Sequence, residues 1–203
     1  MNNTLIFLRH GETKVDKDTP ISEWDLTTEG ARQAQDIAQN TFFHDVDIFI
    51  ISTEKKAQQT IAPLLDTLRE ANRKFEVMYS SEIAEMDRDK GDFMDHDTYE
   101  ATAKEALTHP EVKANDGKWE SAASARERFT TKVGIVDAEN HNRKILFVGH
   151  GYTMNMYIAE LQGEQDVYSR LKRNNFGDWS VVRNGKVIKD FHEPLDRLGE
   201  RLV

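Results

Sequence analysis

Short apolar runs alternate with amphipathic segments through most of this sequence. The runs at 4–8 and 144–148 begin with one polar residue and are otherwise apolar, which is typical of strands buried on both faces. Strands that alternate with helices predict an α/β three-layer sandwich, with a mostly parallel central sheet flanked by helices. Asn184-Gly185 separates two more strand patterns and predicts a C-terminal antiparallel hairpin. Strands are expected at 4–8, 46–51, 75–79, 144–148, 179–183 and 186–191, helices at 27–40, 55–70 (kinked at Pro63), 98–107, 121–139 and 153–161, and a loop or lid at 82–97.

Length and composition limit the class of protein. A chain of 203 residues favours one domain, 1–203. Cysteine is absent, which excludes disulfides, thiolate nucleophiles and cysteine-based zinc sites. The formal net charge of −9 disfavours nucleic acid as a partner. The sequence shows neither an apolar run near the ~20 residues of a membrane span nor a signal-like N-terminus, so we expect no membrane association and a cytoplasmic location.

Two of the apolar runs end in the same way, in Arg9-His10-Gly11 and in Gly149-His150-Gly151. In open α/β sheets, ligands bind outside the carboxyl ends of the strands. If the two strands are neighbours, His10 and His150 face each other across one crevice, and each glycine permits close approach to a ligand. Two unrelated histidines, each bonded to a backbone carbonyl, are the alternative. The matching contexts, with Arg9 beside His10, favour a functional pair.

This set of residues suits phosphoryl transfer. A phosphoryl group carries charge on three equatorial oxygens, and catalysis consists mostly of positioning it and neutralising that charge. Arg9 offers a planar fork that matches phosphate oxygens. One neutral histidine can attack phosphorus and form a covalent intermediate, while a second, protonated histidine stabilises the transition state. A general acid must then protonate the leaving oxygen.

Five segments follow one another in an order that a known family shares. They are Leu8-Arg9-His10-Gly11-Glu12-Thr13, then Leu26-Thr27-Thr28-Glu29-Gly30 with Gln33-Ala34, then residues 52–60, then Trp119-Glu120-Ser121, and finally Val148-Gly149-His150-Gly151. In this order they resemble the histidine phosphatase superfamily, also called phosphoglycerate mutase-like. A lone Arg-His-Gly would be weak support, whereas five segments in order are specific.

The resemblance implies a metal-independent phosphatase without a cofactor, acting on a small phosphorylated substrate. By this resemblance His10 is the nucleophile that becomes a phosphohistidine. The resemblance also implies a proton donor after the third strand, for which Glu85 is the best match, with Glu82 and Asp87 as rivals. A solvated loop carboxylate is the alternative for Glu85. The implied phosphate-binding groups are Arg9, Lys56, His150, Thr13, Asp16 and the backbone N–H of Gly151.

Two positions depart from the family pattern. The family usually has arginine where Lys56 stands, and lysine keeps the charge but loses the bidentate geometry. Lys56 could instead be an exposed helix lysine. The family often has asparagine where Asp16 stands, and an ionised Asp16 would repel a phosphate. Asp16 then points away, is neutralised by a cation, or weakens the pocket.

Three other functions are weighed against phosphomonoester hydrolysis. His10, Glu12 and His150 could supply three zinc ligands, but Arg9 beside His10 would repel a cation. Phosphoglycerate-mutase-type transfer is disfavoured because the chain shows no long substrate-capping insertion. A catalytically weak phosphate-binding or regulatory module is the third alternative. The sequence identifies neither the substrate nor the oligomeric state.

Overall fold

The computed structural model describes residues 2–194 and has a six-stranded sheet at its centre. The strands are β1 (Thr4–Arg9), β2 (Ile48–Ser52), β3 (Glu76–Ser80), β4 (Lys144–Gly149), β5 (Trp179–Arg183) and β6 (Lys186–Lys189). Their order in the sheet is β3-β2-β4-β1-β5-β6. The first four strands are mutually parallel, and β5 and β6 form the antiparallel hairpin. The predicted mostly parallel sheet with a C-terminal hairpin is therefore confirmed.

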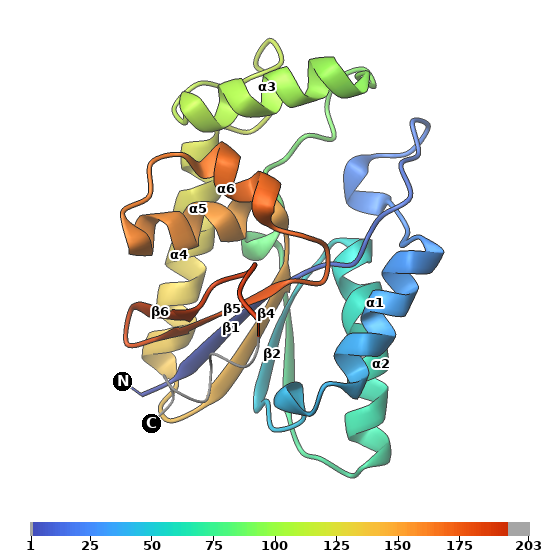
Figure 1. Cartoon of the computed structure of the whole chain (residues 1–203), viewed down its shortest axis with the longest axis vertical. Helices are drawn as coiled ribbons and strands as arrows, with labels where there is room; N and C mark the ends of the chain where they lie inside the picture. The colour runs from blue at the N-terminus through green and yellow to red at the C-terminus, as the bar shows by residue number, and fades with distance from the viewer. Residues whose placement is uncertain (1, 195–203) are drawn as a thin grey trace.

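Helices cover both faces of this sheet, as Figure 1 shows. On one face lie α1 (Thr28–Gln39) and α2 (Lys55–Glu70), which share a core cluster with the sheet. On the other face lie α4 (Ala122–Glu139) and α5 (Gly151–Gln162), which contribute to a second core cluster. This arrangement is the predicted three-layer sandwich.

The central strand β1 shows why the strand sequences are apolar throughout. Ile6 and Leu8 belong to the core on the α1 and α2 side, whereas Leu5 and Phe7 belong to the core on the α4 and α5 side. Successive side chains of a strand point to opposite faces, so a strand covered on both faces needs apolar residues at every position. Phe7 also stacks on Phe147 of β4, with the ring centroids 5.1 Å apart.

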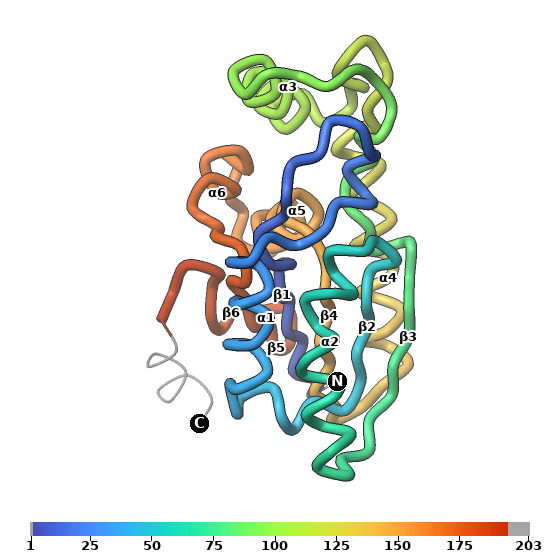
Figure 2. Tube along the Cα trace, turned by 90° about the vertical axis from the view of Figure 1, so that its right-hand side faces the viewer, coloured from blue at the N-terminus to red at the C-terminus, as the bar shows by residue number. Residues whose placement is uncertain are grey.

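The carboxyl ends of the parallel strands form the functional end of the sheet. Figures 1 and 2 both show α3 (His96–Thr108) at this end, together with the segment that joins β1 to α1. A third core cluster lies here, in which Ala103 of α3 and Trp119 pack with Met156 of α5. The short helix α6 (Val167–Arg173) adds partly buried side chains to it. Loops from several elements therefore meet where ligands are expected to bind.

Several details differ from the sequence prediction. The helix α6 was not predicted, and α3 begins two residues earlier than expected. The helix α2 contains Pro63, and the kink expected there stays a prediction. The segment 82–97 is mostly irregular, as predicted, but it begins within a 3₁₀ turn at Ser81–Ile83. In the part of the chain that the structure describes, we find no helix with the length and apolarity that crossing a membrane requires.

Candidate active site

The pairing of β1 with β4 brings the two His-Gly turns together. Arg9 lies opposite Gly149 in the parallel register, so His10 and His150 follow their strands side by side. The centroids of the two imidazole rings are 5.3 Å apart and the rings are tilted by 58°. The predicted juxtaposition of the two histidines is confirmed.

His10 has one ring nitrogen held and one available. Its Nδ1 lies 2.7 Å from the carbonyl oxygen of Gly11. A carbonyl only accepts, so Nδ1 carries the proton in the neutral ring and Nε2 keeps its lone pair. Burial lowers the pKa of His10 well below its usual range, and the nearby His150, Arg9 and Lys56 lower it further. The ring is therefore neutral at pH 7, which is the form that can attack phosphorus.

The glycine after His10 is required by the protein itself. A Cβ atom on Gly11 would lie 2.8 Å from the carbonyl oxygen of Gly30 in α1, and one on Gly30 would lie 2.1 Å from the carbonyl oxygen of Glu12. The N–H of Gly11 donates to Thr60 Oγ1 of α2 at 2.8 Å. Gly11 is thus required for the contact between this turn and α1, and the close approach of a ligand to it stays a prediction.

Arg9 is held in place beside His10. Its guanidinium donates to the carbonyl oxygen of Asn174 and lies over the ring of Phe176, 4.2 Å from the centroid. The same Phe176 ring is 5.5 Å from the His10 ring. Gly151 leaves room for the guanidinium, because a Cβ there would approach Arg9 Cζ to 3.2 Å. Arg9 Nε is buried and has no partner among the described residues, so it can donate to a ligand.

His150 is completely buried at the start of α5. Its Nε2 lies 2.7 Å from Ser52 Oγ and 3.4 Å from Glu54 Oε1. Its Nδ1 is buried and finds no hydrogen-bond partner within residues 2–194. Burial lowers the pKa of His150 well below its usual range, and Lys56 and other nearby cations lower it further. The pocket therefore contains a neutral histidine with one unused nitrogen.

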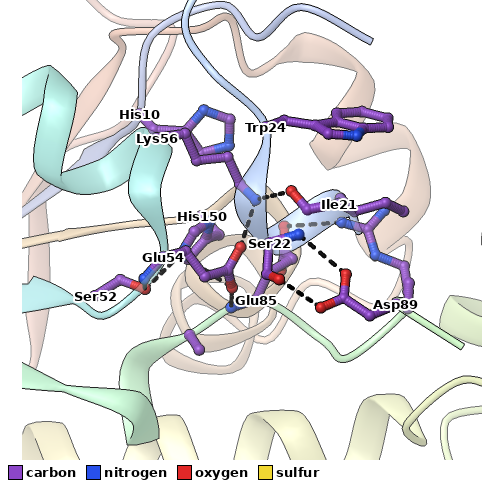
Figure 3. Close-up of polar contacts among 12 residues, drawn as sticks. His10, Ile21, Ser22, Trp24, Ser52, Glu54, Lys56, Glu85, Asp89 and His150 are labelled. Carbon is purple, nitrogen blue, oxygen red and sulfur yellow. Dashed lines mark hydrogen bonds and ion pairs between the residues drawn. The ribbon is translucent and has the colours of Figure 1, made fainter. Parts of the chain in front are cut away.

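Lys56 lies inside the pocket and is not an exposed helix lysine. Its residue exposure is only 2%, although it lies in the first turn of α2. Figure 3 shows its ammonium group between the carbonyl oxygen of Ile21, at 2.7 Å, and the carboxylate of Glu54. The segment that contains Ile21 is also tied to the loop after β3, because Ser22 Oγ donates to Asp89 Oδ2 at 2.5 Å. Two loops thus cover the ammonium group.

Of the three candidate proton donors, only Glu85 enters the site. It is 7% exposed, and its carboxylate accepts from the backbone N–H groups of Tyr152 (3.1 Å) and Thr153 (3.3 Å) at the start of α5. The side chain of Glu82 is 55% exposed and pairs with Lys132. Asp87 is exposed, and its carboxylate accepts from the N–H of Asp89 at 3.0 Å. The geometry therefore favours Glu85 over its rivals.

Thr13 and Asp16 make their contacts elsewhere. Thr13 forms an isolated bridge with Leu26. The carboxylate of Asp16 accepts from the N–H of Asp18 at 3.0 Å, and its carbonyl accepts from Trp24 Nε1 at 2.8 Å. In the described part of the chain, no hydrogen bond or ion pair joins either side chain to the two histidines. Their role in phosphate binding stays a prediction.

Sequence reasoning assigned no role to Ser52, Glu54, Arg88 and Phe176. Ser52 and Glu54 could have been found, because Ser52 ends β2 and Glu54 follows it shortly, at the same sheet end as the histidines. The side chain of Arg88 is buried, and its Cζ lies over the ring of Tyr152, 4.4 Å from the centroid. Its Nη2 is 3.7 Å from Glu85 Oε2. Burial would lower the pKa of Arg88, but Tyr99, Tyr152, Glu85 and Glu54 raise it above its usual value.

A cavity adjoins the site on the side of the two covering loops. Ile21, whose carbonyl holds Lys56, lines this cavity and links it to the pocket. Its other walls combine aromatic rings with charged groups, including Trp24, Tyr99, Trp119, Arg88, Asp16 and Asp89.

The zinc alternative gains no support from the geometry. Glu12 accepts from Thr27 Oγ1 at 2.7 Å, at the cap of α1. The described residues include no group of three or more histidine, aspartate or glutamate side chains that could hold a metal ion.

Comparisons with known structures support the fold. The protein YhfR from Bacillus stearothermophilus aligns with a TM-score of 0.73 at 18% identity, over 97% of this chain and 99% of its own. A phosphoserine phosphatase mutant from Entamoeba histolytica, in complex with phosphoserine, aligns with a TM-score of 0.70 at 18% identity, over 94% and 97%. A mycobacterial glucosyl-3-phosphoglycerate phosphatase aligns with a TM-score of 0.68 at 19% identity, over 88% and 90%.

Comparisons of sequence identify the family. No curated protein matches the chain. The family model of the histidine phosphatase superfamily (branch 1) matches residues 5–196, which is nearly the whole chain. The match includes both His-Gly turns, the buried Lys56 and Glu85. The chain therefore belongs to branch 1 of the histidine phosphatase superfamily.

Proposed function

We propose that this protein is a phosphomonoester hydrolase that works through a phosphohistidine on His10. The observation that carries the proposal is the geometry of the His10 ring, whose Nδ1 is held by the carbonyl of Gly11 and whose Nε2 has no hydrogen-bond partner among the described residues. Burial lowers the pKa of this ring and so favours its neutral form. Two of the similar structures are of phosphatases, which supports hydrolysis as the reaction class.

The reaction has two steps in this proposal. In the first, His10 Nε2 attacks phosphorus, the bond from phosphorus to the ester oxygen breaks, and Glu85 gives its proton to the leaving alcohol. In the second, Glu85 takes a proton from a water molecule whose oxygen attacks phosphorus, and the P–N bond breaks. Glu85 gives up a proton in the first step and regains one in the second. His10 and Glu85 therefore return to their starting forms.

The pocket supplies the charge that the transferred group requires. Arg9 Nε and His150 Nδ1 are buried polar atoms without a partner in the described chain, and both can bind phosphate oxygens. Lys56 and the N–H of Gly151 complete the proposed set of donors. The neutral His150 would take up a proton when the phosphate dianion enters, since an adjacent anion favours the charged form of an imidazole.

The alcohol part of the substrate is proposed to occupy the adjoining cavity. Its walls include Trp24, Tyr99 and Trp119, which offer flat apolar surfaces to a planar group. An aryl phosphate is therefore a suitable first probe. Mutase-type transfer and phosphate binding without turnover are the two alternatives, and the assay below separates the second of them from hydrolysis.

The test is hydrolysis of 4-nitrophenyl phosphate with excess chelator, comparing wild type with His10→Ala. We expect turnover by wild type and none by the variant, with both proteins folded by circular dichroism. Equal turnover in the variant would rule out His10 as the nucleophile. No turnover by wild type, together with thermal stabilisation by phosphate or vanadate, would favour the binding module.

A further inference from the structure

The carboxylate of Glu54 lies inside the proposed phosphate pocket. Glu54 is 8% exposed and caps no helix with its side chain. Its Oε1 accepts from the backbone N–H of Glu85 at 2.6 Å and lies 3.4 Å from His150 Nε2. Its Oε2 accepts from the ammonium group of Lys56. Figure 3 shows this carboxylate between Lys56 and His150.

One of these partners, Lys56, belongs to the proposed set of phosphate donors. Lys56 is the only one of these partners with a permanent positive charge, and its ammonium group is shared between Glu54 and the carbonyl of Ile21. A phosphate oxygen that binds Lys56 must therefore replace or share one of these two acceptors. A buried carboxylate beside a phosphate dianion also repels it, since like charges interact strongly where water is excluded.

The same carboxylate stabilises the empty pocket. Lys56 is 2% exposed, and a buried ammonium group without a counter-ion is strongly unfavourable. Arg9 and Arg88 are also buried here, so the pocket carries several positive charges when no ligand is bound. Glu54 neutralises part of that charge and keeps Lys56 in place. Its presence favours the empty state and disfavours the phosphate-bound state.

We propose that Glu54 is a resident counter-ion that competes with the phosphoryl group for Lys56, and so sets the affinity for phosphate. Phosphate displaces Glu54 from Lys56 when it binds, and the ion pair between Glu54 and Lys56 forms again when the product leaves. This role rests on the proposed function of the pocket. It makes Glu54 a residue that limits product affinity, distinct from the proton donor Glu85.

The proposal predicts opposite effects of Glu54→Gln on stability and on affinity. Glutamine is nearly isosteric, removes the charge and replaces one of the two acceptor oxygens with an N–H donor. The ligand-free variant should melt at a lower temperature than wild type, because Lys56 loses its counter-ion. It should bind inorganic phosphate and vanadate about tenfold more tightly or better, a factor that corresponds to one step of 1.4 kcal/mol. The inhibition constant of phosphate in the hydrolysis assay should fall by the same factor.

Isothermal titration with inorganic phosphate measures this without requiring turnover. The matched control is Glu76→Gln, which removes the same charge from the exposed start of β3 and should bind phosphate as wild type does. Tighter binding by Glu54→Gln alone supports the proposal. If the wild-type protein turns over substrate, and Glu54→Gln binds phosphate no more tightly than wild type, the proposal is overturned. A Glu54→Gln variant that loses turnover with unchanged phosphate affinity also overturns it. Absence of both binding and turnover in wild type overturns the proposed function and this inference together.

A structure of the wild-type protein with vanadate gives a second test that does not depend on the variant folding. The expected result is contact between Lys56 Nζ and a vanadate oxygen, with the Glu54 carboxylate separated from Lys56. A Glu54 carboxylate that still bridges Lys56 and His150 beside bound vanadate would contradict the proposal.

Discussion

A single hydrogen bond decides which nitrogen of His10 reacts. Because Nδ1 faces the carbonyl of Gly11 at 2.7 Å, the proton of the neutral ring is fixed there and Nε2 remains a nucleophile. The proton donor is likewise positioned by backbone groups, since Glu85 accepts from two N–H groups at the start of α5. At the scale of single residues, backbone donors and acceptors hold both reacting side chains in place.

Glu85→Gln tests the proton donor. We expect kcat for an alkyl phosphate to fall by about 10²–10⁴-fold, the usual contribution of a general acid, because an alkoxide leaves poorly without a proton. For 4-nitrophenyl phosphate the loss should be much smaller in the first step, because nitrophenolate is a stable anion. Burst kinetics with both substrates measure this difference. Glu82→Gln is the control, and an equal loss in that variant would contradict the assignment.

Close backbone contact fixes how α1 begins against the turn after β1. The N–H of Thr27 donates to the carbonyl of Glu12 at 2.9 Å, and Gly30 in the first turn of α1 lies against the same carbonyl. No side chain fits between these backbones. The element that carries His10 is therefore positioned by a glycine outside the site.

Two glycine substitutions should have opposite effects on stability. In Gly30→Ala the new Cβ would lie 2.1 Å from the carbonyl oxygen of Glu12, so the backbone must shift, at a cost of about 1–3 kcal/mol. In Gly134→Ala, inside α4, no atom lies within 4 Å of the new Cβ, and a gain of about 0.5–1 kcal/mol is expected. Urea unfolding measures both. A stable Gly30→Ala or an unstable Gly134→Ala would contradict the packing described.

The elements show what the sequence predicts well and what it does not. Strands buried on both faces have an unmistakable apolar pattern, and residues at their carboxyl ends identify most of the pocket. The seven-residue α6 is too short for a clear helical period, and it was missed. Lys56 and Glu54 were not recognised as a buried pair, because their burial depends on Ile21 and on the loop of Glu85. Phe176 reaches His10 only through the packing of a distant loop, which no local pattern indicates.

The whole molecule is acidic, yet its pocket concentrates buried cations. The formal net charge is −9, while Lys56, Arg88 and Arg9 all lie close enough to His150 to lower its pKa. Burial lowers the pKa of both histidines and the nearby cations lower it further, so the folded protein disfavours protonation at two sites that the unfolded chain can protonate. Stability and catalytic protonation state are therefore coupled through the same groups.

This coupling predicts that the protein loses stability in acid. The pKa values of His10 and His150 are lowered in the folded state, so the unfolded state binds more protons once the pH falls below its histidine pKa of about 6.5. Each histidine then removes up to about 1.4 kcal/mol per pH unit from the free energy of unfolding, and above that pH its contribution is fully present. Urea unfolding between pH 7 and pH 5, about the histidine range, measures the slope. His10→Gln should reduce it, and an unchanged slope would contradict the buried neutral state.

The most direct test of the central claim is detection of the phosphoryl group on the protein. Wild type is mixed with 4-nitrophenyl phosphate, quenched within the first turnovers in alkali, and digested for mass spectrometry. The account predicts one phosphoryl group on His10, stable in alkali and lost in acid, and absent from His10→Ala. A phosphoryl group on another residue, or steady turnover without any phosphoprotein, would contradict the mechanism.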